Sequence, residues 1–261
     1  MPTFYQITSY IKHKLHEIDE HSLHSPSLFK LYQDCFNRAK EIPEDKGIEN
    51  IRTRFRSDER SINITDFGAG SKISAENSRT LQSIARGGIT TSKYSRLFQE
   101  LIRNFGCRNI IEFGTSIGIN TMYLASSNPD ARIWTFEGCM PIAEIAEQTF
   151  NDLKYTNIEV IKGNIDHTLS RFLHNSEDID FVFIDANHTY ISTLSYFKQV
   201  RPKLSDRSIV IIDDIYWSKE MTRVWNDISY QTPEAACIDI HKCGIIIFDR
   251  KMSPDRVKFE F

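Results

Sequence analysis

Two stretches of the sequence place aspartates directly after runs of apolar residues. Asp185 follows the run in DFVFIDANHTY, and Asp213 and Asp214 follow the run in SIVIIDDIYWSK. Such runs are typical of buried parallel strands, and open α/β sheets bind ligands at the carboxyl ends of those strands. If the two strands are neighbours, three carboxylates meet at one rim and offer the hard oxygen ligands that Mg²⁺ or another divalent cation prefers. The sequence therefore predicts a metal site at Asp185, Asp213 and Asp214.

The structural alternative for each aspartate is a cap at the start of the following helix, which strand-to-helix loops commonly use. We favour the metal interpretation because three carboxylates occur together, with His188 and Trp217 close by in the sequence. His188 is the candidate general base beside Asp185, since imidazole is the side chain that most often moves protons near neutral pH. A surface or capping histidine is the open alternative for His188.

A glycine loop precedes these stretches and has the surroundings of a cofactor site. The segment IIEFGTSIG (110–118) is entered by a strand-like run and left by a helix-like one, and the next strand-like run ends at Glu137. Nucleotide-binding loops need this order, with an acid at the end of the second strand for ribose hydroxyls. Gly114 and Gly118 permit close backbone approach to a ligand. The cofactor-binding residues expected from the loop and the strand after it are Glu112, Gly114, Thr115, Ser116, Gly118 and Glu137.

A second stretch, ITDFGAGS (64–71), also runs from apolar residues to an acid and glycines. It lacks a clean apolar helix after the loop, and no strand with a terminal acid follows it. We therefore interpret it as a turn in the N-terminal region, with a lid over the active site as the alternative.

The glycine loop resembles the first motif of class I S-adenosylmethionine-dependent methyltransferases. Its pattern is E-x-G-x-x-x-G, with two glycines, whereas dinucleotide oxidoreductases prefer G-x-G-x-x-G. Glu137 corresponds to the family's acid on the ribose. The resemblance implies S-adenosyl-L-methionine as the cofactor, with Asn164 near the adenine and Asp185 at the cofactor as well as at the metal.

The later stretches resemble metal-dependent O-methyltransferases of the catechol and caffeoyl-coenzyme A type. His188 stands where that family has a lysine base, and Asp214 stands where it has asparagine. The combination of Asp-x-x-His and Asp-Asp also resembles macrolide sugar O-methyltransferases. The resemblance covers about residues 90–250. It implies transfer of a methyl group to a hydroxylated small molecule, with the metal binding the acceptor hydroxyl and His188 removing its proton.

The elements that must position these residues alternate regularly along the chain. Strand-like runs occur at 109–113, 132–136, 158–161, 179–184 and 208–212, with helix-length segments between them. This alternation predicts an α/β fold, a Rossmann-like doubly wound and mostly parallel sheet. Two final runs, 236–240 and 244–248, predict a C-terminal antiparallel hairpin. An apolar helical stripe from Tyr94 to Phe105 leads into the first strand, and Gly106 ends it.

The first ninety residues are expected to form an N-terminal helical extension, residues 1–90, ahead of the methyltransferase domain, residues 91–261. Ser25 is a plausible cap for the helix that starts at Pro26. This extension is expected to cover the acceptor pocket or to form a homodimer contact. The segment HKLHEIDEHSLH (13–24) holds four histidines. We expect an exposed helix and turn there rather than a metal site.

The bulk composition excludes several classes of protein. The net charge of −3 gives no reason to expect nucleic-acid binding. Five cysteines without a CxxC pair argue against structural zinc or a disulfide framework and indicate a cytoplasmic protein. No signal peptide and no membrane span are expected.

Three alternatives stay open at this point. The first is a methyltransferase that acts on nitrogen or oxygen without metal, with structural aspartates. The second is a catalytically inactive protein that binds S-adenosylmethionine. The third is an RNA methyltransferase, which the lack of basic excess disfavours.

Overall fold

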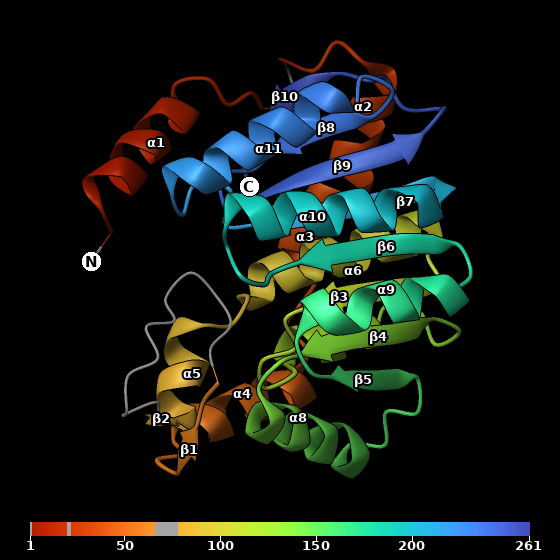
Figure 1. Cartoon of the computed structure of the whole chain (residues 1–261). Helices are drawn as coiled ribbons and strands as arrows, with labels where there is room; N and C mark the ends of the chain where they lie inside the picture. The colour runs from red at the N-terminus through yellow and green to blue at the C-terminus, as the bar shows by residue number, and fades with distance from the viewer. Residues whose placement is uncertain (1, 20–21, 66–77) are drawn as a thin grey trace.

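The computed structural model describes residues 2–19, 22–65 and 78–261 and is built around an eight-stranded sheet. The strand order is β10-β8-β9-β7-β6-β3-β4-β5 (Figure 1). The strands are β3 (Asn109–Phe113), β4 (Arg132–Glu137), β5 (Ile158–Lys162), β6 (Ile179–Ile184), β7 (Leu204–Asp213), β8 (Ala236–Asp239), β9 (Cys243–Asp249) and β10 (Arg256–Lys258).

The sheet confirms the predicted Rossmann-like architecture. Strands β3 to β7 pair in parallel, whereas β9 pairs antiparallel with both β7 and β8. The order reverses at β3, because the chain proceeds from β3 through β4 to β5 on one side and continues with β6 and β7 on the other. In open α/β sheets the crevice at such a switch point is where ligands bind.

Helices cover both faces of this sheet (Figure 1). Those in the first part of the chain are α1 (Phe4–Lys14), α2 (Pro26–Leu31), the π-helical η2 (Tyr32–Asn37), α3 (Arg38–Glu41), α4 (Lys46–Arg56) and α5 (Leu81–Gly87). The others are α6 (Ser92–Phe105), α7 (Ile119–Ala125), α8 (Met140–Asp152), α9 (Ile165–Asn175), α10 (Tyr190–Val200), the 3₁₀ turn η3 (Arg201–Lys203) and α11 (Lys219–Gln231).

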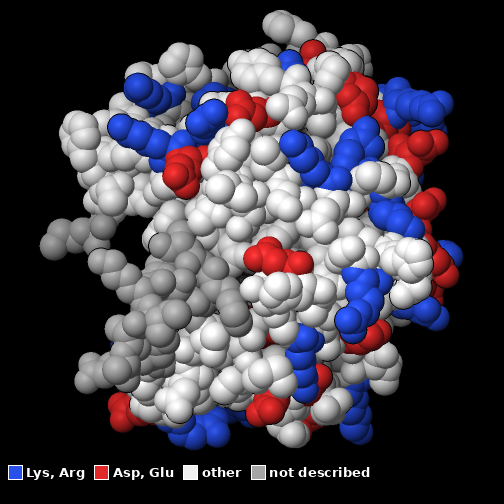
Figure 2. All heavy atoms as spheres, viewed as in Figure 1, with Lys and Arg blue, Asp and Glu red and all other residues white. Residues whose placement is uncertain are grey.

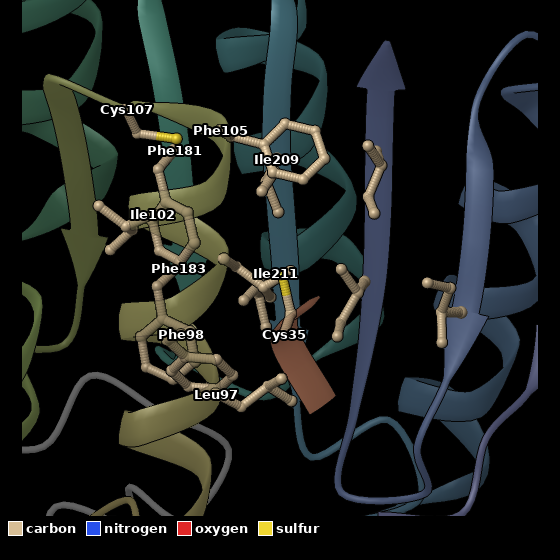
Figure 3. Close-up of a cluster of buried hydrophobic side chains, with 14 of the residues drawn as sticks. Cys35, Leu97, Phe98, Ile102, Phe105, Cys107, Phe181, Phe183, Ile209 and Ile211 are labelled. Atoms are coloured by element: carbon tan, nitrogen blue, oxygen red, sulfur yellow. The ribbon is translucent and has the colours of Figure 1, made fainter. Parts of the chain in front are cut away.

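Alternating side chains of the strands pack into two separate hydrophobic cores, one on each face of the sheet. Phe181 and Phe183 of β6 face α6, where Phe98 lies 5.1 Å from Phe183 between ring centres (Figure 3). Val182 and Ile184 face the opposite way and pack in the cluster that holds α9, α10 and α11. This two-sided burial explains why β6 reads as a continuous apolar run rather than as an alternating one.

The helices from α2 to α5 share the hydrophobic core of the domain. Buried side chains of α2, η2 and α3 belong to the same apolar cluster as α6 and β6, and those of α4 and α5 join α7 and α8. Ser25 caps α2 as expected, since its hydroxyl accepts a hydrogen bond from the Leu28 amide. The domain boundary at residue 90 stays a prediction.

The expectation for the histidine segment is wrong at one position. His13 is only 2% exposed, and its Nε2 lies 3.1 Å from Asp239 Oδ1 while its Nδ1 lies 3.3 Å from Glu17 Oε2. Asp239 is the last residue of β8 and lies more than two hundred residues away in sequence. The local sequence pattern therefore could not show that His13 is buried. His16, in contrast, is exposed.

Two small strand features were not predicted from sequence. A hairpin of β1 (Ser61–Asn63) and β2 (Ser78–Thr80) flanks the segment 66–77, so DFGAGS (66–71) lies outside the described residues. The short strand β10 adds in parallel to β8.

In the part of the chain that the structure describes, no helix combines the length and apolarity that a membrane crossing requires. Acidic and basic side chains are interspersed on the face shown in Figure 2.

Candidate functional site

A cavity of about 570 Å³ opens at the carboxyl ends of β3, β4, β6 and β7. It brings together most of the residues that the sequence analysis selected. Those that line it are Gly114, Ser116, Glu137, Asn164, Asp185, His188, Asp213 and Asp214. The cavity therefore joins the glycine loop to the cluster of carboxylates in a single space.

Gly114 is the point at which these two parts of the site meet. Its φ is +100°, a conformation that side-chain-bearing residues rarely adopt. A Cβ at this position would lie 2.3 Å from the carbonyl oxygen of Asp185. The glycine is thus required both by the turn after β3 and by the close approach of the loop after β6.

The Glu137 carboxylate lies at the end of β4 and is held by backbone amides. Ser116 donates to its Oε2 and Cys139 donates to its Oε1, each at 2.9 Å. Burial raises the pKa of Glu137, and these backbone donors lower it in opposition. Each carboxylate oxygen can accept a further hydrogen bond, so the group is suited to hold neighbouring hydroxyls of a ligand.

Three expected cofactor residues do not line the cavity. Glu112 is fully buried and accepts hydrogen bonds from Asn120, Thr121 and Thr135. Burial raises its pKa to about 7. Its contacts tie β3 to β4 and to α7, so it supports the glycine loop from beneath.

Thr115 and Gly118 support the same loop from within. The Thr115 hydroxyl lies 2.7 Å from that of Thr135 and is buried. Gly118 caps α7 with φ +81°, and a Cβ there would lie 2.5 Å from the Phe150 ring. A direct role for Glu112, Thr115 and Gly118 in cofactor binding stays a prediction. Asn164 does line the cavity, but its side-chain oxygen caps α9 through the Asp166 amide.

The carboxylates form a compact cluster. One ligand atom each from Asp185, His188 and Asp214 lies within 4.8 Å of the others, a group that could hold a metal ion. His188 Nε2 lies 3.4 Å from Asp185 Oδ1. Asp213 is 2% exposed, and its Oδ1 has no hydrogen-bond donor among the described residues. The carboxylate oxygens of Asp185 and Asp214 and the unpartnered buried oxygen of Asp213 are donors that fit a divalent cation, and His188 lies beside them as a candidate base.

Burial and mutual repulsion perturb these acids. Burial raises the pKa of Asp185 to about 7, although Lys242 acts in the opposite direction. The pKa of Asp213 is likewise raised to about 7, by burial first and by Asp185 and Asp214 as well. Carboxyl groups perturbed in this way and gathered in one cavity are typical of functional sites.

Backbone strain is concentrated around the same cavity. The described non-glycine residues with positive φ are Ser116, Lys154, Asn187, His188, Asp214 and His241. Four of them line the cavity, and His241 lines a neighbouring one. Such conformations each cost about 1–3 kcal/mol and persist where the surrounding structure imposes them, commonly at active sites.

Sequence reasoning missed Lys242, which lies in the turn between β8 and β9 and reaches the acid cluster. Its Nζ lies 2.8 Å from Asp213 Oδ2 and 2.5 Å from Asp214 Oδ1. It also missed the segment 83–90 and Arg79 as parts of the cavity wall. Trp217, selected from sequence, lines the cavity and lies 6.5 Å from His188 between ring centres.

A second cavity of about 450 Å³ adjoins the first and shares Asp214, Trp217 and Lys242 with it. Its remaining wall is largely aromatic and includes residues of the N-terminal helix. The rings around it are Tyr10, Tyr94, Tyr216, Trp217 and His241. A ligand there would lie against the acid cluster on one side and aromatic rings on the other.

Comparison with known proteins shows what the domain is similar to. Residues 111–215 match the family model of a methyltransferase domain. An O-methyltransferase from Aspergillus flavus, imqG, is 28% identical over 167 residues, which are 58% of this chain and 66% of that protein. The match thus spans just under two thirds of that relative's length.

Solved structures share the fold. An O-methyltransferase from Bacillus cereus in complex with SAH has a TM-score of 0.60 at 18% identity, over 83% of this chain and 96% of that one. TomG, an O-methyltransferase from Streptomyces achromogenes in complex with SAM, has a TM-score of 0.59 at 15% identity, over 83% and 95%. A putative caffeoyl-CoA O-methyltransferase from Staphylococcus aureus has a TM-score of 0.55 at 21% identity, over 64% and 88%.

Proposed function

We propose that this chain, in which residues 111–215 match a methyltransferase domain and which shares the fold of an O-methyltransferase solved with SAH, methylates a hydroxyl group of a small molecule with the help of a divalent cation. The observation that carries the proposal is the single cavity that joins Gly114 and Glu137 to Asp185 and His188. A methyl donor at the glycine loop and an acceptor at the acid cluster would then share one space.

The cofactor half of the site is suited to S-adenosylmethionine, which supplies a methyl group on a positively charged sulfur. Glu137 would accept hydrogen bonds from the ribose hydroxyls, and Gly114 leaves room for the ligand along the backbone. Asn164 borders the same space on the β5 side. The ionised carboxylates of Glu137 and of Asp185, at the border of the two halves, would complement the sulfonium charge.

The acceptor half contains the groups that would handle the hydroxyl proton. Asp185, Asp213 and Asp214 would hold Mg²⁺ or a similar cation, which supplies Lewis acidity that lowers the pKa of a bound hydroxyl. His188 Nε2 already faces the cluster, 3.4 Å from Asp185 Oδ1, so it can accept the proton there. Placement of the acceptor oxygen in line with the methyl–sulfur bond is the remaining requirement.

The second cavity is the proposed entrance for the acceptor. It meets the first at Asp214 and Trp217, and residues of α1 such as Ile7 and Tyr10 form part of its wall. The N-terminal extension would therefore select the acceptor, a sugar, another natural product or a catechol-like compound. Cavities of about 570 and 450 Å³ suit a small-molecule acceptor. The five cysteines are buried and unpaired, which supports a reducing compartment such as the cytoplasm.

Turnover of S-adenosylmethionine with a panel of hydroxylated acceptors tests the proposal. We expect an O-methylated product and loss of activity with EDTA that added Mg²⁺ reverses.

A second candidate, methyl transfer without metal, is favoured by one observation: the Lys242 ammonium already binds Asp213 and Asp214. Activity that survives EDTA would favour this candidate. Binding of S-adenosylmethionine without turnover of any acceptor would favour an inactive binding protein.

The affinity for Mg²⁺ is expected to rise steeply between pH 6 and pH 8. The pKa values of Asp185 and Asp213 are raised to about 7, so protons compete with the metal up to that pH. Each proton that the metal must displace from these acids gives a gain of up to about tenfold in affinity per pH unit below pH 7, and the gain levels off above it. Ordinary aspartates would be ionised by about pH 5 and would show no such slope. Calorimetric titration at pH 6, 7 and 8 measures this, and equal affinities at pH 6 and 8 would contradict it.

A further inference from the structure

Lys242 forms the closest ion pairs of the acid cluster. Its Nζ contacts one oxygen of each adjacent aspartate, Asp213 Oδ2 at 2.8 Å and Asp214 Oδ1 at 2.5 Å. Burial lowers the pKa of this lysine, but the surrounding carboxylates raise it by more, so that it is charged at any physiological pH. Asp185 is among the carboxylates that raise the pKa of Lys242.

The turn that carries Lys242 is held tightly. The Lys242 amide donates to the Ile240 carbonyl at 2.7 Å, and His241 has φ +63°. A Cβ at Gly244 would lie 2.4 Å from the Trp225 ring of α11, so the start of β9 packs directly against that helix. The fold therefore fixes the backbone of this turn, and the two ion pairs hold the ammonium against the cluster.

The charges of the cluster add up to the value that one divalent cation balances. With all three aspartates ionised, the carboxylates of Asp185, Asp213 and Asp214 give −3, and Lys242 changes the sum to −2. Only one oxygen of Asp213 contacts the lysine. Its other oxygen, Oδ1, is buried in the cavity wall without a donor among the described residues. The lysine thus neutralises part of the cluster but leaves a ligand position free.

We infer that Lys242 is a built-in counter-ion of the metal site, which offsets the charge of Asp214 and limits how tightly the site binds a divalent cation. The inference depends on one part of the proposed function, the metal site, and does not depend on methyl transfer. Lys242 is a positioning residue in this account, because it acts on the ligands and not on the substrate. Its fixed charge repels the incoming cation, and partly buried charges of this kind are screened less than fully exposed ones.

Binding of Mn²⁺ alone, measured by calorimetry at pH 8, tests the inference. Lys242→Met removes the charge but retains much of the side-chain length, and we expect it to bind Mn²⁺ about tenfold tighter or more than the wild type. Lys242→Arg retains the charge and should stay within about threefold of the wild type. Lys203→Met is the matched control: Lys203 donates to the Ser176 carbonyl before β7 begins, at the opposite end of that strand, and its loss should leave the affinity unchanged.

A second pair of variants keeps the test decisive if Lys242→Met does not fold. Asp214→Asn alone brings the cluster to −1 and should weaken binding, whereas Asp214→Asn with Lys242→Met restores −2 and should bind more tightly than Asp214→Asn alone. Equal or weaker Mn²⁺ binding after removal of Lys242, in either background, would overturn the inference. Absence of Mn²⁺ binding in every variant would also overturn it, while S-adenosylmethionine turnover in the same samples would show separately whether methyl transfer survives.

Discussion

Replacing Asp185 by asparagine is expected to lower kcat for methyl transfer roughly 10²- to 10⁴-fold. The substitution keeps the size of the side chain but removes the charge at the centre of the cluster. Asp185 is the residue that connects the two halves of the cavity, since its backbone touches the glycine loop and its carboxylate faces His188. The expected loss corresponds to the several kcal/mol that a bound metal contributes through charge stabilisation.

Single-turnover kinetics with saturating S-adenosylmethionine measure this effect without a contribution from product release. Asp206→Asn is a suitable control, because Asp206 belongs to β7 but lies exposed at its other end, paired only loosely with Arg250 at 3.8 Å. The dissociation constant of S-adenosylmethionine should change much less than kcat in Asp185→Asn. If Asp185→Asn retained nearly full kcat, Asp185 would have no role in the reaction.

Replacing Gly114 by alanine is expected to eliminate detectable S-adenosylmethionine binding and to reduce the free energy of unfolding by at least about 2 kcal/mol. Two costs combine at this position. The φ of +100° strains any residue with a Cβ, and that Cβ would lie 2.3 Å from the Asp185 carbonyl oxygen. Because the obstacle is backbone, the loop after β3 must move away from the loop after β6, and the cavity between them changes shape.

Gly106 provides a matched control for this change. It also has a positive φ, +68°, as the cap of α6, but a Cβ there would have no neighbour within 4 Å. Gly106→Ala should therefore cost only the conformational strain and leave cofactor binding intact. Chemical denaturation and calorimetry on both variants separate the two contributions. Equal behaviour of Gly106→Ala and Gly114→Ala would show that the contact with Asp185 is unimportant.

The parts of the site that sequence could predict are those at strand ends. Continuous apolar runs located β3, β6 and β7, and the residue after each run had to lie at the carboxyl edge of the sheet. Parallel pairing then brought Gly114, Asp185 and Asp213 to one rim. Their placement at one rim could be predicted because it needed only strand positions and the topology that short crossover connections impose, whereas their roles stay predictions.

The parts that sequence could not predict depend on contacts between distant segments. Lys242 lies in a hairpin turn, where a lysine is unremarkable until the antiparallel pairing of β9 with β7 places it beside Asp213. His13 looked exposed because its partner Asp239 is supplied by the last part of the sheet. Residues 83–90 carry no hydrophobic period that would mark them as a cavity wall.

The central claim is that one cavity holds the methyl donor beside the acid cluster. A crystal structure with S-adenosylhomocysteine and Mn²⁺, with anomalous data at the manganese edge, tests it most directly. The account predicts the adenosyl group against Gly114 and Glu137, the sulfur directed toward His188, and an anomalous peak bound by Asp185 and Asp214. S-adenosylhomocysteine bound elsewhere on the chain, or a manganese peak away from these aspartates, would contradict it.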